Sequence, residues 1–447
     1  MENLYQLTAD PIGRLVRAIS IPASIGFFFN TMFNVIDTYY AGLISTQALA
    51  ALSLSFPVFF IIIAFGSGIS TGTTTLIATA LGGKDLAQAR MLAIQGISFG
   101  VILSLAVTAV GILASPRLFL LLGASGDYLE LCLVFMDTIF YGSVFFIMNY
   151  MLNAILNAQG DTRSFRNFLI AGCFLNAALD PWFIYGGLGL PPMGVMGVAL
   201  ATVVVQMLGN IYLSHKVSRS ELSCRDCLGE IVPRARAFRE IFAQGFPTSL
   251  NSVSVGIGIF VITYFISMFG KEAVAAYGVA TRVEQIILMP TIGLSIATVT
   301  MVAQNNGARL FGRIFETVRT ALVYGGVFMA AGTVALLLFA GQLMGLFTSD
   351  TRVIEVGTTY LRIASFILYA YVVLYVNVSA LQGLKRPGYG LIIGVIRQIA
   401  LPVVLFPLFA QVFNMGLVGI WAGIFIINWG AAVFTYFYAR AFLMRLS

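Results

Sequence analysis

The sequence predicts an all-α integral membrane protein with twelve transmembrane helices in two six-helix bundles. Three observations support this fold class. Of the 447 residues, 59% are hydrophobic and only 10% are charged, whereas soluble proteins carry about 25% charged residues. Apolar runs long enough to cross a bilayer follow one another along the chain, and its second half resembles its first. This composition excludes a soluble enzyme, and we expect no nucleic-acid partner.

Twelve apolar runs account for most of the chain. A transmembrane helix needs about 20 mostly apolar residues to cross a hydrocarbon layer about 30 Å thick, and the runs do not alternate as transmembrane β-strands do. Short polar connections separate them. We predict spans at 13–40, 48–81, 89–115, 128–157, 164–186, 193–214, 239–268, 273–306, 316–340, 353–382, 390–411 and 416–442.

The basic residues predict the orientation of these spans. The connections on one side carry most of the Lys and Arg residues, while the loops on the other side have only Arg117, Lys271 and Arg352. Because basic loops stay in the cytoplasm, we predict that both termini and the polar segment 215–238 are cytoplasmic. The protein is then a multi-pass protein of the cell membrane (the inner membrane in a Gram-negative cell), and we expect a monomer.

A weak internal repeat relates the two halves at a spacing of 222–225 residues. Each half contains six spans, so both copies have the same orientation, as two bundles related by a pseudo-two-fold axis along the membrane normal would. We predict an N-terminal bundle at 1–214, a cytoplasmic linker at 215–238 and a C-terminal bundle at 239–447. The matching segments are Ala48–Ser53 with Ala273–Gly278, Gly83 with Gly307, Gln159-Gly160 with Gln382-Gly383, and Met193–Gly197 with Met415–Gly419.

Polar residues share one face of several spans in the first half. In span one, Asn30, Asn34 and Asp37 follow spacings of four and three, which place them on one stripe of a helix. In span five, Asn176 and Asp180 are four residues apart. Polar groups facing lipid cost several kcal/mol each, so these faces should point into the bundle. We expect a substrate cavity lined by Asn30, Asn34, Asn149, Tyr150, Asn153, Gln206 and Glu284.

The two aspartates suit ion coupling in either of two ways, because ionisable groups in mid-membrane are functional candidates by default. Two carboxylates that lie close together repel each other, and such a pair can keep a proton near neutral pH. Alternatively, Asp37 and Asp180 with the oxygens of Asn176 and Thr202 form an all-oxygen site for a hard cation such as Na⁺. A structural role is also open for Asp180, which precedes Pro181 and could cap a broken helix.

The second half has no aspartate deep in a span. Arg282 and Glu284 are two residues apart and so do not share a helix face, which means that Glu284 needs another partner or a cavity. We therefore expect ion handling in the first half. Pro22 should bend span one ahead of Asp37 and is a candidate hinge.

The combined pattern resembles the multidrug and toxic compound extrusion (MATE) transporters. The resemblance rests on twelve spans in two halves, an acidic residue late in span one, Asn-x-x-x-Asp-Pro at 176–181, and Gln-Gly ahead of a basic turn. Because the acidic residues lie in spans one and five and are absent from the depths of spans seven and ten, the chain looks like the DinF-like branch.

The resemblance implies a function and assigns residues to it. It implies export of amphipathic, often cationic organic compounds, driven by inward H⁺ or Na⁺ and without any other cofactor. Ion coupling is carried onto Asp37, Asn176, Asp180 and Thr202, with possible Na⁺ binding there, and the bending of span one onto Pro22. The second cation site of the NorM-like branch is not carried over, since its acidic residues are missing here.

Other functions are predicted less well by the sequence. A flippase for a lipid-linked precursor should bury several basic residues, and only Arg282, Arg362 and Arg397 qualify. A membrane acyltransferase needs a catalytic His, but His215 lies at a span end. Cys224 and Cys227 have zinc-site spacing but lack a second pair of ligands, so we interpret them as reduced thiols.

Overall fold

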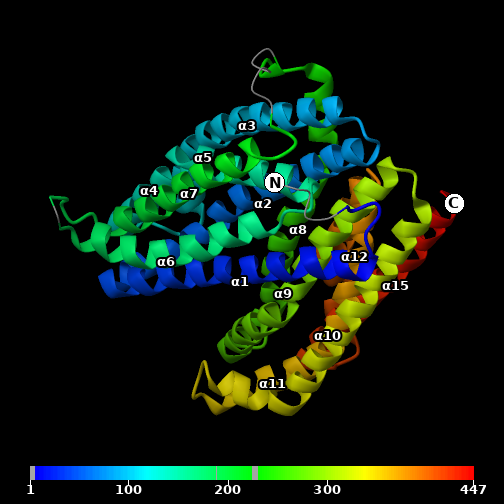
Figure 1. Cartoon of the computed structure of the whole chain (residues 1–447). Coiled ribbons are helices and arrows are strands. Elements are labelled where there is room, and N and C mark those ends of the chain that lie inside the picture. The colour runs from blue at the N-terminus through cyan, green and yellow to red at the C-terminus, as the bar shows by residue number, and fades with distance from the viewer. Residues whose placement is uncertain (1–5, 188, 224–229, 447) are drawn as a thin grey trace. The chain divides into compact units, whose positions relative to one another are not determined.

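The computed structural model describes residues 6–187, 189–223 and 230–446, and every predicted span is helical in it (Figure 1). Among these described residues, ten helices are each long and apolar enough to cross a membrane, and two bent helix pairs bring the number to twelve. The described residues contain no strand that belongs to a sheet. The predicted fold class is confirmed.

The chain forms two compact units, and the boundary between them falls inside helices. Among the described residues, unit 1 comprises Ile25–Ser249, and unit 2 comprises the residues up to Ser24 and from Leu250 onward. Two helices therefore belong to both units, namely α1 (Ile12–Ile44) and α8 (Ala235–Ser267).

The boundaries of these units differ from those of the predicted bundles, which were 1–214 and 239–447. The first half of α1 belongs to unit 2 with the later helices, and the first half of α8 belongs to unit 1 with the earlier ones. In both helices the division follows a proline by two residues, Pro22 in α1 and Pro247 in α8. The prolines are 225 residues apart, which is the spacing of the internal repeat.

Unit 1 contains six helices besides its parts of α1 and α8. The predicted fourth span is broken at Gly142 into two helices that meet at 45°. The α2 and α3 helices begin at side-chain caps, where Ser45 and Asp85 accept backbone N–H groups. The helices are α2 (Thr46–Gly82), α3 (Leu86–Leu121), α4 (Gly126–Tyr141), α5 (Ser143–Ala158), α6 (Arg163–Tyr185) and α7 (Val195–Ser218).

Unit 2 repeats this arrangement with one additional irregularity. Its predicted tenth span is broken near Phe366 into helices at 50°, and its eleventh span contains two π-helical turns. The elements are α9 (Lys271–Gly307), α10 (Phe311–Gly345), α11 (Thr351–Ser365), α12 (Leu368–Gly383), α13 (Pro387–Val395), η2 (Ile396–Ala400), α14 (Leu401–Pro407), η3 (Leu408–Val412) and α15 (Gly416–Met444).

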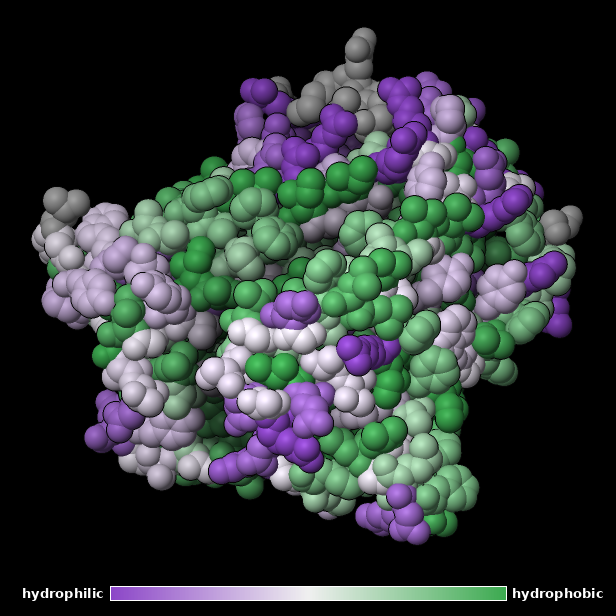
Figure 2. Space-filling view, turned by 90° about the horizontal axis from the view of Figure 1, so that it is seen from below, coloured by the Kyte–Doolittle hydropathy of each residue, from purple (hydrophilic) through white to green (hydrophobic). Residues whose placement is uncertain are grey.

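The surface is suited to lipid rather than to water. Large apolar side chains such as Leu113, Leu121 and Val327 are more than two-thirds exposed. Figure 2 shows one face, on which hydrophobic side chains cover broad stretches and hydrophilic ones gather in separate clusters. Exposed apolar surface on this scale indicates contact with a bilayer.

The backbone confirms the internal repeat and corrects two of its pairings. Lys84 and Arg309 both have positive φ after a helix end, and they are 225 residues apart. Gly160 and Lys385 occupy the same kind of position. In all four turns the next residue donates its N–H back to the helix over five residues, as a Schellman motif does. Gly160 therefore corresponds to Lys385, and the predicted alignment of Gln159-Gly160 with Gln382-Gly383 is shifted by two residues. Gly83 likewise corresponds to Ala308, so its predicted pairing with Gly307 is shifted by one residue.

The segment that precedes α8 is held against α3. The Gln95 carboxamide is fully buried, donates to the carbonyls of Glu230 and Val232, and accepts the N–H of Arg234. Ser98 donates to the carbonyl of Ile231 at 2.9 Å. The described end of the predicted linker is thus a packed part of unit 1.

Glycines allow two close helix contacts that repeat between the units. In unit 1, a Cβ on Gly68 would overlap the backbone of Ser249 in α8. In unit 2, a Cβ on Gly293 would overlap Ser20 and Ser24 in α1. Gly68 and Gly293 are again 225 residues apart. The first half of α8 therefore packs against Gly68 of unit 1, and the first half of α1 packs against Gly293 of unit 2. Small residues permit such close helix contacts in membrane proteins.

We predict that Gly68→Ala lowers the free energy of unfolding by about 1–3 kcal/mol, because the added methyl group overpacks this contact. The matched control is Gly278→Ala in α9, where a Cβ meets open space and helix propensity favours Ala by about 1 kcal/mol. Thermal unfolding of the purified protein in detergent measures both changes. Equal stability of the two variants would contradict the close contact.

Candidate functional site

Two buried carboxyl groups in unit 1 share a single hydrogen-bond donor. The Nδ2 atom of Asn176 in α6 donates to Asp37 Oδ1 at 2.6 Å and to Asp180 Oδ2 at 2.9 Å. The Thr202 hydroxyl in α7 lies 3.3 Å from Asp37 Oδ2. Three helices, α1, α6 and α7, thus converge on the predicted ion-coupling residues, and the structure brings all four side chains together.

The local sequence explains why these side chains meet. Asn176 and Asp180 are one helical turn apart and face the same way, and Tyr40 ties α1 to α6 by donating to the carbonyl of Ala177 at 3.2 Å. The α6 helix continues through Pro181 to Tyr185. Asp180 therefore does not cap a broken helix, and its carboxyl group is directed at Asn176.

The pair has no positive partner. Asp180 and Asn176 are 0% exposed and Asp37 is 9% exposed. Within the described parts of the chain, neither carboxylate lies within 4.0 Å of a Lys or Arg nitrogen. Burying an unpaired charge is costly, and burying two adjacent negative charges is more so. The site therefore needs a positive charge that the described side chains do not supply.

Two further oxygens at this site lack hydrogen-bond partners. Asn176 Oδ1 and Asp180 Oδ1 are both buried and accept no hydrogen bond among the described residues. Orphaned buried acceptors usually mark a place where a proton, an ion or a water binds. The donor set, two carboxylates with amide and hydroxyl oxygens, fits a proton or a hard monovalent cation.

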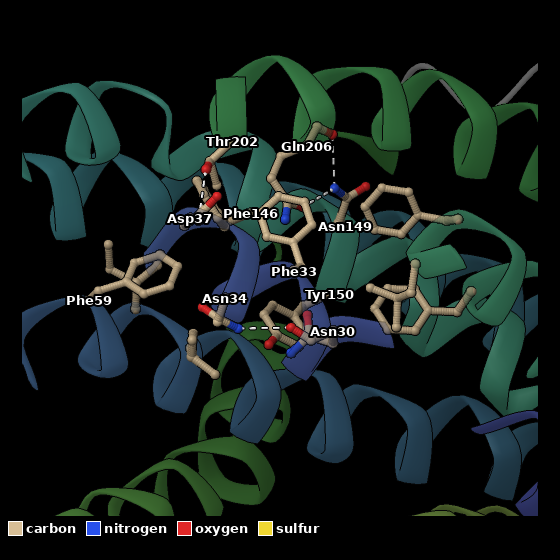
Figure 3. A pocket seen from close by; sticks show the side chains of 15 residues that line it. Asn30, Phe33, Asn34, Asp37, Phe59, Phe146, Asn149, Tyr150, Thr202 and Gln206 are labelled. Atoms are coloured by element: carbon tan, nitrogen blue, oxygen red, sulfur yellow. Dashed lines mark hydrogen bonds between the residues drawn. The ribbon is translucent and has the colours of Figure 1, made fainter. Parts of the chain in front are cut away.

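A pocket of about 50 Å³ opens beside Asp37 (Figure 3). Asp37 and Thr202 belong to its wall, so the carboxylate pair and the pocket share two side chains. This volume accommodates a small ion with water, whereas sites for drug-sized molecules measure about 300–1,000 Å³. Most of the predicted cavity residues line it, namely Asn30, Asn34, Asn149, Tyr150 and Gln206.

The amide side chains of this pocket are fixed by hydrogen bonds that leave acceptors free. Asn149 Nδ2 donates to Gln206 Oε1 at 2.7 Å and to the Gln206 carbonyl at 2.9 Å, while Asn149 Oδ1 is buried without a donor. Asn34 donates to the carbonyl of Asn30 at 2.8 Å (Figure 3). The pocket therefore offers oxygen acceptors beside a negative site, which favours ligands with N–H groups or positive charge.

Two of the predicted cavity residues, Asn153 and Glu284, do not line this pocket, and neither does the predicted hinge residue Pro22. Asn153 lies one turn beyond Asn149 and has a buried, unpartnered Oδ1. Glu284 belongs to unit 2, where it accepts a hydrogen bond from Tyr360. Pro22 lies in α1 on the unit 2 side of the boundary. Cys224 and Cys227 lie outside the described residues.

The sequence reasoning missed the aromatic part of the pocket wall. Phenylalanines from α1, α2, α5 and α6 surround the polar stripe. Only Phe33 had a positional signal, because it lies between Asn30 and Asp37 on the same helical face. In a chain with 37 phenylalanines, the others cannot be told from core or lipid-facing rings. The missed residues are Phe33, Phe59, Phe146, Phe165 and Phe168.

Twelve spans in two repeated units among the described residues, with a buried ionisable site and a pocket that share side chains, are typical of a membrane transporter. A family model described as MatE matches residues 22–182 and 247–408. The two matches begin at Pro22 and Pro247 and so follow the internal repeat. The chain therefore belongs to the MatE family of multidrug and toxic compound extrusion (MATE) transporters.

Curated proteins and solved structures agree with this assignment. The chain is 25% identical over 406 residues to the multidrug export protein MepA of Staphylococcus aureus, covering 91% of this chain and 89% of MepA. It is 27% identical over 410 residues to the probable multidrug resistance protein NorM of Thermotoga maritima, covering 91% and 87%. A solved multidrug resistance MATE transporter of the MOP superfamily in an outward-facing conformation matches with a TM-score of 0.93 and 26% identity, covering 100% and 99%.

We predict that Asn176→Ala lowers the free energy of unfolding by about 1–3 kcal/mol, because it removes the one amide that both carboxyl groups share. Asn167→Ala on the same helix is the control, since Asn167 is exposed and surface substitutions change stability by about 0.5 kcal/mol or less. Thermal melts in detergent compare them. If both variants melt alike, Asn176 does not hold the pair together.

Proposed function

We propose that this protein exports amphipathic, often cationic organic compounds from the cytoplasm in exchange for inward H⁺ or Na⁺. The observation that carries the proposal is the shared donor between Asp37 and Asp180 in a buried site without a basic partner. The similarity to a multidrug export protein and to a probable multidrug resistance protein supports the substrate class.

The carboxylate pair explains how an ion could be coupled to transport. Two adjacent buried carboxylates are most stable when one positive charge lies between them, either a proton or Na⁺ held by the surrounding oxygens. Loss of that charge leaves repulsion that a movement of α1 relative to α6 would relieve. The ion would bind from the outside and leave to the cytoplasm.

The shared wall explains how a substrate could compete with that ion. Asp37 and Thr202 belong both to the carboxylate site and to the wall of the pocket. A cationic substrate near Asp37 would satisfy the same negative charge, so that ion and substrate displace each other, as antiport requires. Because the pocket holds about 50 Å³ here, a bulky compound would need a conformation in which the surrounding phenylalanines separate.

The prolines supply the proposed hinges. Pro22 and Pro247 lack the N–H that would close a helical hydrogen bond, and each lies two residues before the division between the units. Bending at these positions would let each half-helix move with the unit to which it belongs. Alternating access would then use two matched hinges rather than one.

The distribution of acidic residues supports placement in the DinF-like branch. The carboxylate pair lies in α1 and α6 of the first repeat, whereas the NorM-like branch carries further acidic residues deep in the seventh and tenth spans, where this chain has them only near the span ends, at Glu240 and Glu355. A flippase for a lipid-linked precursor is not favoured, because Arg282 and Arg362 are exposed and only Arg397 of the three candidates is buried.

The proposal predicts that Asp37→Asn and Asp180→Asn each reduce gradient-driven export of a cationic dye such as ethidium by at least about tenfold, since neutral Asn removes the ion's charge partner. Inverted vesicles with an imposed H⁺ or Na⁺ gradient measure the rate and identify the ion. Asp127→Asn, on an exposed part of α4, should export normally. Native rates for Asp37→Asn under both gradients would overturn the proposed coupling.

We further predict that Pro22→Ala and Pro247→Ala each slow dye export several-fold without loss of thermal stability, because Ala restores the helical hydrogen bond and stiffens the hinge. Pro57→Ala, inside α2 and away from the unit boundary, should keep the native rate. Vesicle export and melting temperatures are compared for the three variants. Export equal to that of Pro57→Ala would exclude these prolines as hinges.

A further inference from the structure

A second buried charged cluster lies in unit 2 and has no part in the carboxylate site described above. Its two ionisable side chains are Glu284 in α9 and Arg397 in η2, and both are 5% exposed. Tyrosines from three helices surround them. The sequence alone indicated that Glu284 needed a partner other than Arg282, and the structure supplies that partner from α11.

The Glu284 carboxyl group is only half satisfied. Its Oε2 atom accepts a hydrogen bond from the Tyr360 hydroxyl at 2.8 Å. Its Oε1 atom is buried and has no donor among the residues that the structure describes. A fully ionised carboxylate in this position would keep one charged oxygen without any hydrogen bond, which is costly in a low-dielectric interior.

Arg397 is close to Glu284 without pairing with it. Its charge acts on Glu284, yet the two groups do not come within 4.0 Å of each other, because no ion pair between them is found in the described chain. The guanidinium instead donates to Asn428 Oδ1 at 2.7 Å. It also lies 5.8 Å and 5.9 Å from the ring centroids of Tyr371 and Tyr375.

Glu284 and Arg397 have opposite charges when both are ionised, yet they remain apart in a buried site. Opposite unit charges attract strongly where the dielectric constant is low, and buried charges are normally paired. The separation is consistent with a Glu284 side chain that carries a proton, because a neutral carboxyl group no longer holds the guanidinium. Arg397 is then stabilised by Asn428 and by the two aromatic faces.

The backbone at Arg397 provides a way for this separation to change. Arg397 lies in η2, a π-helical turn between α13 and α14. A π-turn holds one residue more than the α-helical register, and such turns are frequent at functional sites. Relaxation of the turn would rotate its side chains about the helix axis and move the guanidinium relative to α9.

We propose that Glu284 is a proton-binding site in unit 2, for which the proton and the Arg397 guanidinium compete. With the proton bound, Arg397 rests on Asn428, Tyr371 and Tyr375 as observed. When the proton leaves to water, Arg397 moves to Glu284 and closes an ion pair. The ligand of this site is therefore H⁺, and its release is linked to the backbone of the eleventh span.

The groups facing Glu284 are compatible with this exchange. Its own helix α9 contributes Tyr277, α11 contributes Tyr360, α12 contributes Tyr371, and η2 contributes Arg397. The positive charge near this carboxyl group is that of Arg397. The tyrosines carry no charge at neutral pH, and Tyr360 donates its hydroxyl to Glu284. Glu284 is thus balanced by either a proton or Arg397.

Infrared difference spectroscopy tests the proton directly. Spectra of the purified full chain in acid and alkaline buffer should contain the C=O stretching band of a buried carboxylic acid that disappears at alkaline pH. Glu284→Gln should remove that component of the difference spectrum, and Glu355→Gln on the exposed side of α11 should keep it. An unchanged carboxylic acid signal in Glu284→Gln would overturn the proposal.

Thermal unfolding tests the competition with Arg397. Glu284→Gln imitates the protonated side chain, so its melting temperature should equal the native one in acid and fall below it in alkaline buffer, where the native pair is closed. Glu284→Gln/Arg397→Gln should lose this pH dependence. Equal shifts of Glu284→Gln in both buffers would exclude the ion pair.

These outcomes are independent of the proposed transport function, because neither measurement uses a substrate or an ion gradient. The infrared comparison needs only the native protein, Glu284→Gln and Glu355→Gln. It therefore decides the proposal even if the Arg397 variant does not fold.

Discussion

The arrangement of unit 1 depends on the cost of burying two carboxyl groups without a basic partner. Asp37 and Asp180 come from different helices and are joined through one amide nitrogen of Asn176. An apolar bundle cannot keep two unscreened negative charges together, so the proposed function assigns to this site a mobile positive charge, a proton or Na⁺, that balances the pair. Under that proposal, the packing of α1, α6 and α7 depends on whether the ion is bound.

The internal repeat connects the carboxylate pair to both units, because α1 and α8 are each shared between them. The two helices shared between the units each contain a proline beside the division, and each exchanged half-helix rests on a glycine of the receiving unit. Asp37 lies on the unit 1 side of the division in α1. A change in the charge of the pair therefore acts on a helix whose other half packs with unit 2. The Glu284 and Arg397 cluster would give unit 2 its own response to protons.

Much of the fold could be predicted from the sequence because lipid imposes a simple rule. Every spanning segment must satisfy its own backbone hydrogen bonds, so long apolar runs become helices, and all twelve were found. The break at Gly142 coincides with a glycine, but the break near Phe366 has no glycine or proline to signal it in the sequence. The exchanged halves of α1 and α8 were not predicted either, because hydropathy does not reveal which neighbours a helix packs against.

The polar residues of the candidate site could be predicted because polar residues are rare in membrane spans. Its aromatic residues were missed because apolar residues are common there. Asp37, Asn176 and Asp180 stand out in spans that contain few charges, and helical spacing alone places their faces. The phenylalanines of the pocket and the Tyr360 partner of Glu284 have no comparable signal. Their roles depend on contacts between segments far apart in the chain, such as α9 with α11.

The account depends most directly on the idea that the carboxylate pair holds one exchangeable cation. The sharpest measurement is the release of H⁺ and Na⁺ from the purified protein, in weakly buffered solution, when a cationic dye binds. The account predicts release of one of these ions in proportion to the dye bound, and none from Asp37→Asn. Dye binding of native affinity without release of either ion would contradict it.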